Sequence, residues 1–404
     1  MFESQLERWI VSQAGHDLPL AVVLPSGRRI EMAHPARVEI RLKELSAVRY
    51  LLDPTLNNMG TAYVEGEIDL EGSVEDVIDV GVRLSRLTDG EDFKEPEKGL
   101  LSRLLSHTRS RDKEVIQYHY DVSNDFYELF LGANMVYSCG YFKNDNDTLD
   151  EAQVNKLDHI LNKLRVKAGE TFLDVGCGWG SLIVRAAQRG ARAVGVTLSQ
   201  NQYDYAKEWI ARLGLEERCE VRLQDYREIP HAGGFDKIAS VGMFEHVGMK
   251  NLPIYFRKMH ELLKNGGAML MHGITATYPE RREVGRGGGD FIEKYVFPEG
   301  ELPHVTDAMR IMSKTGFEIV DVESLRRHYA KTLTHWAHRL EAGAERAREL
   351  AGEKRFRIWR VYLAGSAYGF RENWMNIYQI LACKLGGPAM NPFPMTRDWM
   401  YKGS

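Results

Sequence analysis

The chain has 404 residues, a length typical of two or three domains with cores of their own, which excludes a peptide hormone or a small disulfide scaffold. It carries 53 Lys and Arg against 57 Asp and Glu, and this net charge of -4 argues against a protein whose whole surface binds nucleic acid. Hydrophobic residues at 44% and charged residues at 27% are ordinary for globular proteins, so we do not expect long disorder.

Neither the cysteines nor the N-terminus indicate export. Four cysteines lie far apart without a C-x-x-C pair or a neighbouring His, which favours reduced thiols in a cytoplasm and no metal site. Acidic and basic side chains interrupt the first 20 residues, and no apolar run approaches the roughly 18 residues of a membrane span. We therefore expect a cytoplasmic protein that reaches lipid only peripherally, at the inner membrane face.

Residues 1–95 read as a small mixed α+β domain. Period-two alternation or short apolar runs predict three strands, at Leu20–Leu24, Val38–Leu42 and Ala62–Leu70. A helix is predicted over Ser73–Leu87 with Ser73 as its N-cap. Because no catalytic constellation occurs in this stretch, we interpret it as a scaffold or lipid-presenting domain.

Residues 96–114 read as a linker, because bulky apolar side chains are few after Leu105 while Arg and Lys accumulate. Two interpretations stay open. The segment is either a solvated tether or a joint whose basic half contacts anionic lipid headgroups. The remaining residues, 115–404, are then the catalytic domain.

Strands and helices alternate from about residue 165 onward. Predicted strands are Thr171–Val175, Ala193–Val196, Cys219–Leu223, Phe235–Val241, Gly267–His272 and Phe317–Val322. Predicted helices are Ser181–Arg189, Asn201–Leu213, Leu252–Leu263, 332–350 and 353–371. The alternation predicts a doubly wound α/β sheet, and the last apolar segment, Ile377–Leu385, is expected to insert into it as a further strand.

A glycine-rich turn follows the first of these strands. Gly176, Gly178 and Gly180 let the backbone approach a ligand and leave the next helix N-terminus facing it. A dinucleotide enzyme would show G-x-G-x-x-G and an acidic residue about 20 positions later, but Ser181 follows the last glycine and the second strand ends without an acid. The turn therefore disfavours NAD and suits S-adenosylmethionine better.

Seven motifs in order carry a family resemblance: Gln117–Tyr127, Tyr137–Cys139, Asp174–Gly180, Gln224–Arg227, Gly242–Gly248, Lys294–Pro298 and His328–Leu333. Together they resemble the cyclopropane fatty acid synthase family of S-adenosylmethionine-dependent methyltransferases, over residues 115 to 385. The resemblance implies a class I methyltransferase fold with a Rossmann-like doubly wound sheet. The presence of an N-terminal domain is similar to the bacterial phospholipid-modifying branch.

The resemblance also implies an activity. The family transfers a methylene from S-adenosylmethionine to a cis double bond of an acyl chain, here one in an unsaturated membrane phospholipid. A carbocation forms and is deprotonated by bound bicarbonate as the cyclopropane ring closes. The expected partners are therefore the acyl chain and the membrane surface, with no nucleic acid, and a homodimer is compatible with this reading.

The family's site residues carry over to matching positions here. The implied cofactor-binding residues are Tyr137, Ser138, Asp174, Gly176, Gly178, Gly180, Thr197, Leu198, Gln202, Asp225 and Tyr226. The implied catalytic residues, which would hold bicarbonate, are Cys139, Glu245, His272, Ile274 and Tyr329, with His119 nearby. Among the first set, Thr197 and Gln202 would hold the ribose, while Tyr226 and Asp225 would border the adenine.

Three alternatives stay open at this point. The same site suits a fatty acid C-methyltransferase that gives a methyl- or methylene-branched chain. A noncatalytic lipid-binding protein is disfavoured, because Cys139, Glu245, His272 and Tyr329 are all intact. A nucleophilic role for Cys139 is also conceivable, although the reaction needs no covalent intermediate.

Overall fold

The computed structural model describes residues 17–86, 123–231, 233–280, 287–297, 301–387 and 391–401. The chain forms two compact units, each built from separate stretches of sequence. The small unit comprises Met1–Lys98, Glu280–Pro298 and Trp336–Glu372, and the large unit comprises Gly99–Pro279, Glu299–His335 and Asn373–Ser404. The linear division into 1–95, 96–114 and 115–404 therefore differs from these units, and the expected linker lies outside the described residues.

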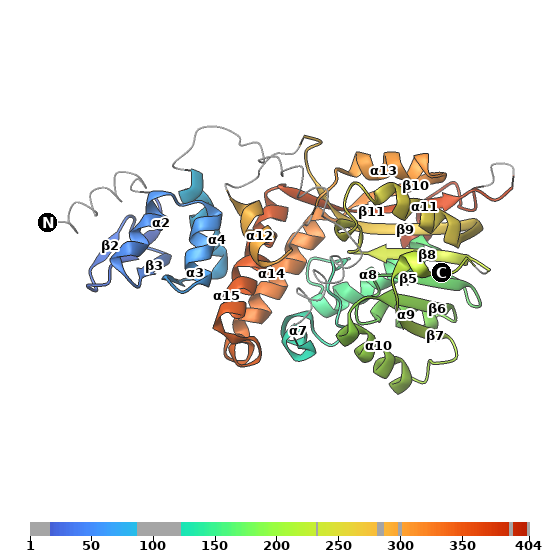
Figure 1. The fold of residues 1–404 in the computed structure, drawn as a ribbon, viewed down its shortest axis with the longest axis horizontal. Helices are drawn as coiled ribbons and strands as arrows, with labels where there is room; N and C mark the ends of the chain where they lie inside the picture. The colour runs from blue at the N-terminus through green and yellow to red at the C-terminus, as the bar shows by residue number, and fades with distance from the viewer. Residues whose placement is uncertain are drawn as a thin grey trace. The chain divides into compact units, whose positions relative to one another are not determined.

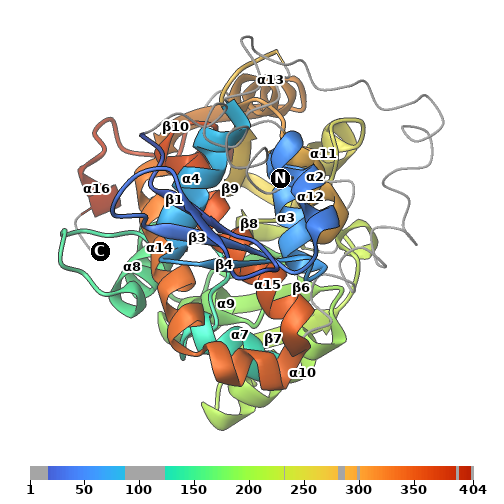
Figure 2. The same cartoon turned by 90° about the vertical axis from the view of Figure 1, so that its left-hand side faces the viewer.

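The small unit contains a four-stranded sheet in the order β2-β1-β3-β4, in which β1 and β3 are parallel. Its described strands are β1 (Leu20–Val23), β2 (Arg29–Glu31), β3 (Val38–Leu42) and β4 (Ile68–Glu71). Its helices are η1 (Leu45–Val48), α2 (Arg49–Leu52), α3 (Leu56–Val64), α4 (Val74–Arg86), α12 (Gly288–Tyr295) and α15 (Ala344–Arg371). Figure 2 shows β3 and β4 with α3 and α4 beside them.

Most predictions for this unit are confirmed, but the strand at Ala62–Leu70 is wrong in its first half. Residues 62–64 end helix α3, and the strand begins only at Ile68. The helix starts at Thr55, whose side chain accepts a hydrogen bond from Asn58 N at 3.0 Å. It ends before Gly66, which has a φ of 79°. Ser73 caps α4 as predicted, because its hydroxyl accepts from Asp76 N.

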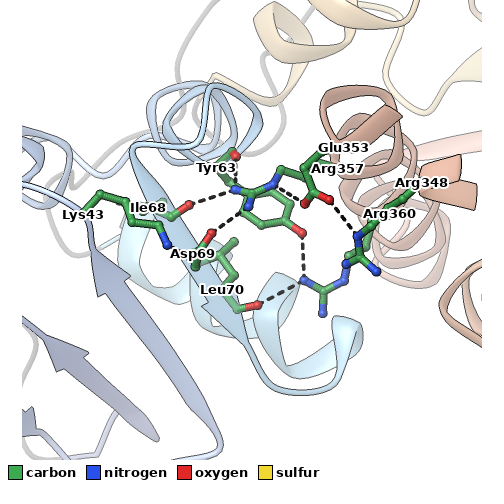
Figure 3. Close-up of polar contacts among 9 residues, drawn as sticks. All are labelled: Lys43, Tyr63, Ile68, Asp69, Leu70, Arg348, Glu353, Arg357 and Arg360. Atoms are coloured by element: carbon green, nitrogen blue, oxygen red, sulfur yellow. Dashed lines mark hydrogen bonds and ion pairs between the residues drawn. The ribbon is translucent and has the colours of Figure 1, made fainter. Parts of the chain in front are cut away.

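Two arginines of α15 fasten this helix to the N-terminal part of the small unit (Figure 3). Arg357 donates to the carbonyls of Tyr63 and Ile68 and pairs with Asp69 at 2.7 Å. Arg360 donates to the Tyr63 hydroxyl and to the carbonyl oxygens of Leu70 and Gly72. We call Arg357, Arg360 and these partners the arginine clamp. A segment more than 250 positions away in sequence thus completes the N-terminal fold.

The large unit contains a seven-stranded sheet in the order β10-β11-β9-β8-β5-β6-β7 within the described residues (Figure 1). Its strands are β5 (Thr171–Val175), β6 (Arg192–Thr197), β7 (Cys219–Leu223), β8 (Phe235–Val241), β9 (Leu263–Ala276), β10 (Phe317–Ser324) and β11 (Met375–Lys384). Strands β5 to β9 run parallel, and β11 inserts antiparallel between β9 and β10. The predicted doubly wound sheet and its inserted last strand are confirmed.

Helices cover both faces of this sheet. One core gathers apolar side chains of α8 (Leu149–Lys163), α9 (Ser181–Gln188) and α10 (Gln200–Arg212). The other gathers those of α11 (Leu252–Leu262) and α13 (Val305–Lys314). Further short elements are α7 (Asn124–Leu131), η2 (Tyr226–Glu228), η3 (Phe244–His246) and α16 (Asp398–Tyr401). Central strands are buried on both faces, which is why their sequences are nearly continuous apolar runs.

Two long helices were predicted at 332–350 and 353–371. The end at residue 371 is confirmed by α15, whereas the other three bounds differ in the structure. Helix α14 covers Arg326–Ala342, and α15 begins directly after Gly343. Gly352, where the break was predicted, instead interrupts α15 with a φ of 80° and a ψ of 160°. The predicted break in helical geometry is therefore present at Gly352. A second break at Gly343 separates α14 from α15.

Candidate functional site

The turn after β5 has the backbone that only glycines adopt easily. Gly176, Gly178 and Gly180 have φ values of 78°, 53° and 93°. A Cβ at Gly176 would lie 3.2 Å from Met243, and one at Gly180 would lie 3.0 Å from Ala206, whereas nothing lies within 4 Å of that position at Gly178. The turn thus packs closely at its two ends and keeps its middle open at the N-terminus of α9.

This open side faces a cavity. Its empty volume is about 960 Å³, a figure that includes open solvent. Its walls are the segments that follow β5, β6, β7 and β8, together with residues 135–138 and part of α8. The predicted cofactor residues that line it are Tyr137, Ser138, Asp174, Gly176, Gly178, Thr197, Leu198, Gln202 and Tyr226. A ligand pocket at the carboxyl ends of parallel strands is the expected arrangement for a doubly wound sheet.

Two predicted cofactor residues, Gly180 and Asp225, do not line this cavity. Gly180 caps α9 and packs on Ala206. Asp225 accepts from Arg227 N at 2.8 Å and forms an ion pair with the guanidinium of Arg227 at 2.6 Å. Both residues therefore hold neighbouring segments of the wall in place but do not themselves line the cavity.

Neutral polar and aromatic groups form one part of the cavity wall. Thr197 Oγ1 donates to Gln202 Oε1 at 2.8 Å, which sets both side chains at the end of β6. The Tyr226 ring packs edge-on against Tyr255 at 5.1 Å, and the Tyr255 hydroxyl donates to Ser240 Oγ at 2.6 Å. This part of the wall offers uncharged hydrogen-bonding groups and a fixed aromatic ring, which suit a nucleoside.

Charged groups lie elsewhere on the wall, and one of them was missed from the sequence. Lys156 of α8 lines the cavity and donates from Nζ to Ser138 Oγ at 2.9 Å. Gln153, one turn earlier on α8, donates to the carbonyl of Ser138 at 2.9 Å. A lysine within an amphipathic helix gives no local sign of a ligand site. Four further wall residues that were not predicted, Trp179, Gln224, Met243 and His246, lie within motifs that had been recognised.

A second group of predicted residues gathers where β8 and β9 end. The backbone N–H of Ile274 donates to Glu245 Oε1 at 2.6 Å, and Gly242 N donates to the carbonyl of His272 at 2.9 Å. Glu245 lies between Met243 and His246, which both line the cavity. The group formed by Glu245, His272 and Ile274 therefore adjoins this cavity along the chain.

Buried atoms in this group lack partners among the described residues. Glu245 Oε2 and His272 Nε2 are both buried without a hydrogen bond. The amide nitrogen of Gln379 lies 3.1 Å from His272 Nδ1, so Nδ1 accepts and the ring proton lies on Nε2. Buried polar atoms are nearly always paired, so one free acceptor and one free donor here indicate a small polar ligand.

Cys139 and Tyr329 are linked to this group through the backbone of Leu325. The Cys139 thiol donates to the carbonyls of Gly140 and Leu325, and Tyr329 N donates to Leu325 O at 2.9 Å. Leu325 N in turn donates to Ile377 O, and Ile377 is the β11 partner of Ile274. Sheet register thus connects residues that lie up to 190 positions apart. His119 lies outside the described residues.

Burial sets the protonation of these groups. It raises the pKa of Glu245 to about 7, and the hydrogen bond from Ile274 only partly opposes this shift. It lowers the pKa of His272 well below its usual value, so the imidazole is neutral. It raises the pKa of the Cys139 thiol far above neutral pH, and a protonated thiol argues against a nucleophilic role.

The family comparisons agree with this geometry. The model of the mycolic acid cyclopropane synthetase family matches residues 107–380, and a domain of unknown function matches residues 12–87.

In the described part of the chain, no helix is both long and apolar enough to cross a membrane.

Similar proteins cover most of the chain. A probable fatty acid methyltransferase of Pseudomonas putida is 45% identical over 387 residues, 95% of this chain and 97% of its own. The cyclopropane synthase MmaA2 of Mycobacterium tuberculosis superposes with a TM-score of 0.65 at 33% identity, over 67% of this chain and 98% of its own. The mycolic acid cyclopropane synthase CmaA1, in complex with SAH and CTAB, superposes with a TM-score of 0.63 at 36% identity, over 67% and 98%. The chain therefore belongs to the mycolic acid cyclopropane synthetase family and is an S-adenosylmethionine-dependent methyltransferase with the class I fold.

Proposed function

We propose that this enzyme adds a methylene from S-adenosylmethionine to the cis double bond of an unsaturated phospholipid acyl chain and closes a cyclopropane ring. The observation that carries the proposal is the pair of unpartnered buried atoms, Glu245 Oε2 and His272 Nε2, beside the cofactor cavity. A plain methyl transfer to nitrogen or oxygen needs no such second site. Ring closure needs one, because a carbon-bound proton must leave.

The electrons balance as follows. The π electrons of the double bond attack the sulfonium methyl carbon, the S–C bond breaks, and its electron pair stays on sulfur as S-adenosylhomocysteine forms. The other alkene carbon becomes a cation. Loss of a proton from the transferred methyl then leaves an electron pair that forms the second C–C bond. The site must therefore fix the methyl, shield a cation from water and accept one proton.

Aromatic side chains next to the cavity are suited to the cationic stage. Tyr137 lines the cavity and packs against Tyr127 at 5.8 Å, and Tyr127 packs against Trp179 at 5.0 Å. Tyr127 is fully buried and Trp179 nearly so. Ring faces attract a cation, and their bulk excludes water that would quench it.

Bicarbonate fits the second site, and when bound it supplies a base for the departing proton. Glu245 Oε2 would accept the hydrogen of its hydroxyl group, while the Nε2–H of His272 would donate to one of its oxygens. Ile274 N holds Glu245 in place through Oε1, and Gln379 holds the His272 ring through Nδ1. Cys139 and Tyr329 would complete the enclosure from the other side of Leu325.

A fatty acid C-methyltransferase is the second candidate, and a specific finding favours it. The Pseudomonas putida relative that spans nearly the whole chain is named a probable fatty acid methyltransferase. In that reaction a hydride shifts from the methylated carbon to the neighbouring cationic carbon. The cation, now on the methylated carbon, then loses a proton from the methyl group to give a methylene branch, or takes a hydride from a separate hydride donor to give a methyl branch. The proton-accepting site would serve the methylene product as well.

Vesicle assays test the proposal. We expect release of S-adenosylhomocysteine on vesicles of a cis-unsaturated phospholipid, and background release on vesicles of a saturated phospholipid with the same headgroup and chain length. Equal release on both vesicles would contradict a reaction at the double bond. Proton NMR of the product lipid separates the candidates, because upfield cyclopropane ring protons support ring closure, whereas vinylidene or branched methyl signals support the second candidate.

A further inference from the structure

Lys156 is a buried charge that neither the sequence motifs nor the proposed mechanism accounts for. Its side chain is only 2% exposed, yet it lines the cofactor cavity from α8. An ammonium group has three N–H donors. Among the described residues, its one hydrogen-bond partner is Ser138 Oγ at 2.9 Å. Two donors of a buried cation are therefore available to a ligand, and a buried charge without compensation is strongly unfavourable.

The hydroxyl of Ser138 is available for the same purpose. Ser138 Oγ accepts from Lys156, so its own hydrogen is free to donate. Gln153 holds the Ser138 backbone by donating to its carbonyl at 2.9 Å. Lys156 and Ser138 thus present several donors to one place on the cavity wall, and these are the groups that a carboxylate accepts from.

Asp174 provides the opposite charge on the same wall. It is 2% exposed, and its Oδ1 has no hydrogen-bond partner among the described residues. Burial raises the pKa of Asp174 to about 7, and the charge of Lys156 opposes that shift. Within the described part of the chain, no direct ion pair joins Lys156 to Asp174. Burial also lowers the pKa of Lys156 to about 8, and the charge of Asp174 opposes that shift. The cavity wall therefore holds one basic and one acidic side chain that lie near each other without direct contact.

S-adenosylmethionine has one region with this pattern of charge. Its adenine and ribose are uncharged, whereas its methionine end carries a carboxylate and an ammonium group. We propose that Lys156 is a positioning residue that binds the methionine carboxylate together with the Ser138 hydroxyl, while Asp174 faces the methionine ammonium. This assignment deepens the cofactor use of the proposed function. By anchoring the carboxylate, Lys156 fixes the sulfonium methyl for transfer.

Calorimetry with two ligands tests the assignment without any lipid. S-adenosylhomocysteine carries the carboxylate, and S-adenosyl-3-thiopropylamine differs from it only by lacking that group. The wild type should bind S-adenosylhomocysteine about 10- to 100-fold more tightly, the range for loss of a charge-assisted hydrogen bond. In Lys156→Met the affinity for S-adenosylhomocysteine should fall by a similar factor, while the affinity for the decarboxylated ligand changes less than about 3-fold. Lys156→Arg should recover part of the preference.

Lys163→Met is the matched control, because Lys163 is also a buried lysine of α8 but pairs with Glu323 and does not line the cavity. It should keep the wild-type ratio of the two affinities. An equal loss for both ligands in Lys156→Met would show a purely structural role and overturn the assignment. A wild type that does not distinguish the two ligands would overturn it even if no variant folds. Because no lipid takes part, failure of the double-bond assignment would leave these outcomes unchanged.

Discussion

Replacing Arg360 by Met should loosen the small unit at the arginine clamp. Arg360 Nε pairs with Glu341 at 2.8 Å, and its terminal nitrogens donate to the Tyr63 hydroxyl, Leu70 O and Gly72 O at 3.2, 3.3 and 3.1 Å. Its side chain is only 10% exposed. Met has a similar stem without the donors, so the change removes the hydrogen bonds and keeps most of the packing.

The expected destabilisation is about 3 kcal/mol. Glu341 and Gly72 are partly accessible to water, which reduces the free energy lost when their hydrogen bonds to Arg360 are removed. Tyr63 and Leu70 are more enclosed. Hydrogen bonds from a charged donor contribute about 1.5 to 3 kcal/mol each, and removing one partner of a buried charged pair costs about 3 to 5 kcal/mol. We take the low end because of that solvent access. A loss of about 3 kcal/mol corresponds to about a 100-fold larger open population.

Hydrogen exchange followed by mass spectrometry measures this loss in the small unit alone. Amides of α3 and β4 should exchange about 100-fold faster in Arg360→Met, because their opening free energy falls by the amount above. Arg346→Met is the control, since Arg346 lies on the same helix, is 56% exposed and, among the described residues, pairs only with Glu349. An exposed pair contributes up to about 1 kcal/mol, so its effect should be small. Equal protection of α3 and β4 in the two variants would refute the clamp.

Three more outcomes are expected. A protein starting at residue 107 should still bind S-adenosylhomocysteine by calorimetry, because every described residue that lines the cavity belongs to the large unit. Its helix α15 should lose exchange protection, since Arg357 and Arg360 lose their acceptors. Glu245→Gln should keep cofactor affinity within about 3-fold, because Glu245 does not line the cavity. Its turnover on unsaturated vesicles should fall by about 100-fold, because Glu245 lies at the proposed proton-accepting site. Near-normal turnover would remove Glu245 from the mechanism. Burial raises the pKa of Glu245 from 4.5 to about 7, so its charge destabilises the folded state increasingly as pH rises through that window. The Glu245→Gln variant should therefore match the wild type near pH 4 and exceed its unfolding free energy by up to about 3 kcal/mol at pH 8, and a difference independent of pH would contradict the buried carboxyl.

Local patterns in the sequence were sufficient for the large unit's sheet and for the cofactor turn. The sheet's inner strands are mostly apolar, whereas the edge strands β7 and β10 alternate apolar with polar residues. The alternation of strands with helices predicts a mostly parallel sheet. The positive φ of Gly176, Gly178 and Gly180 depends on the missing Cβ, a property of the residue itself. The family resemblance added Glu245, His272 and Ile274 as site residues, and the structure joins two of them through a hydrogen bond from Ile274 N to Glu245 Oε1.

Contacts between distant segments were not predictable in this way. Residues 62–64 were predicted as the start of an alternating strand, Ala62–Leu70, but are helical. The Thr55 cap and the packing of Met59, Ala62 and Tyr63 outweigh the local pattern. Arg357 and Arg360 look like solvated charges of an amphipathic helix until the acceptors of residues 63–72 lie against them.

Lys156 shows the same limit at the site itself. In the sequence it is one lysine on a helix, a residue type that normally extends into water. Only the tertiary structure buries it beside Ser138 and opposite Asp174, 18 residues away on either side in the chain. The sequence by itself determines which helices and strands form, because their formation depends on neighbouring residues along the chain. Which charged side chains are buried together depends on the packing between these elements. The chemistry of this site follows from that packing.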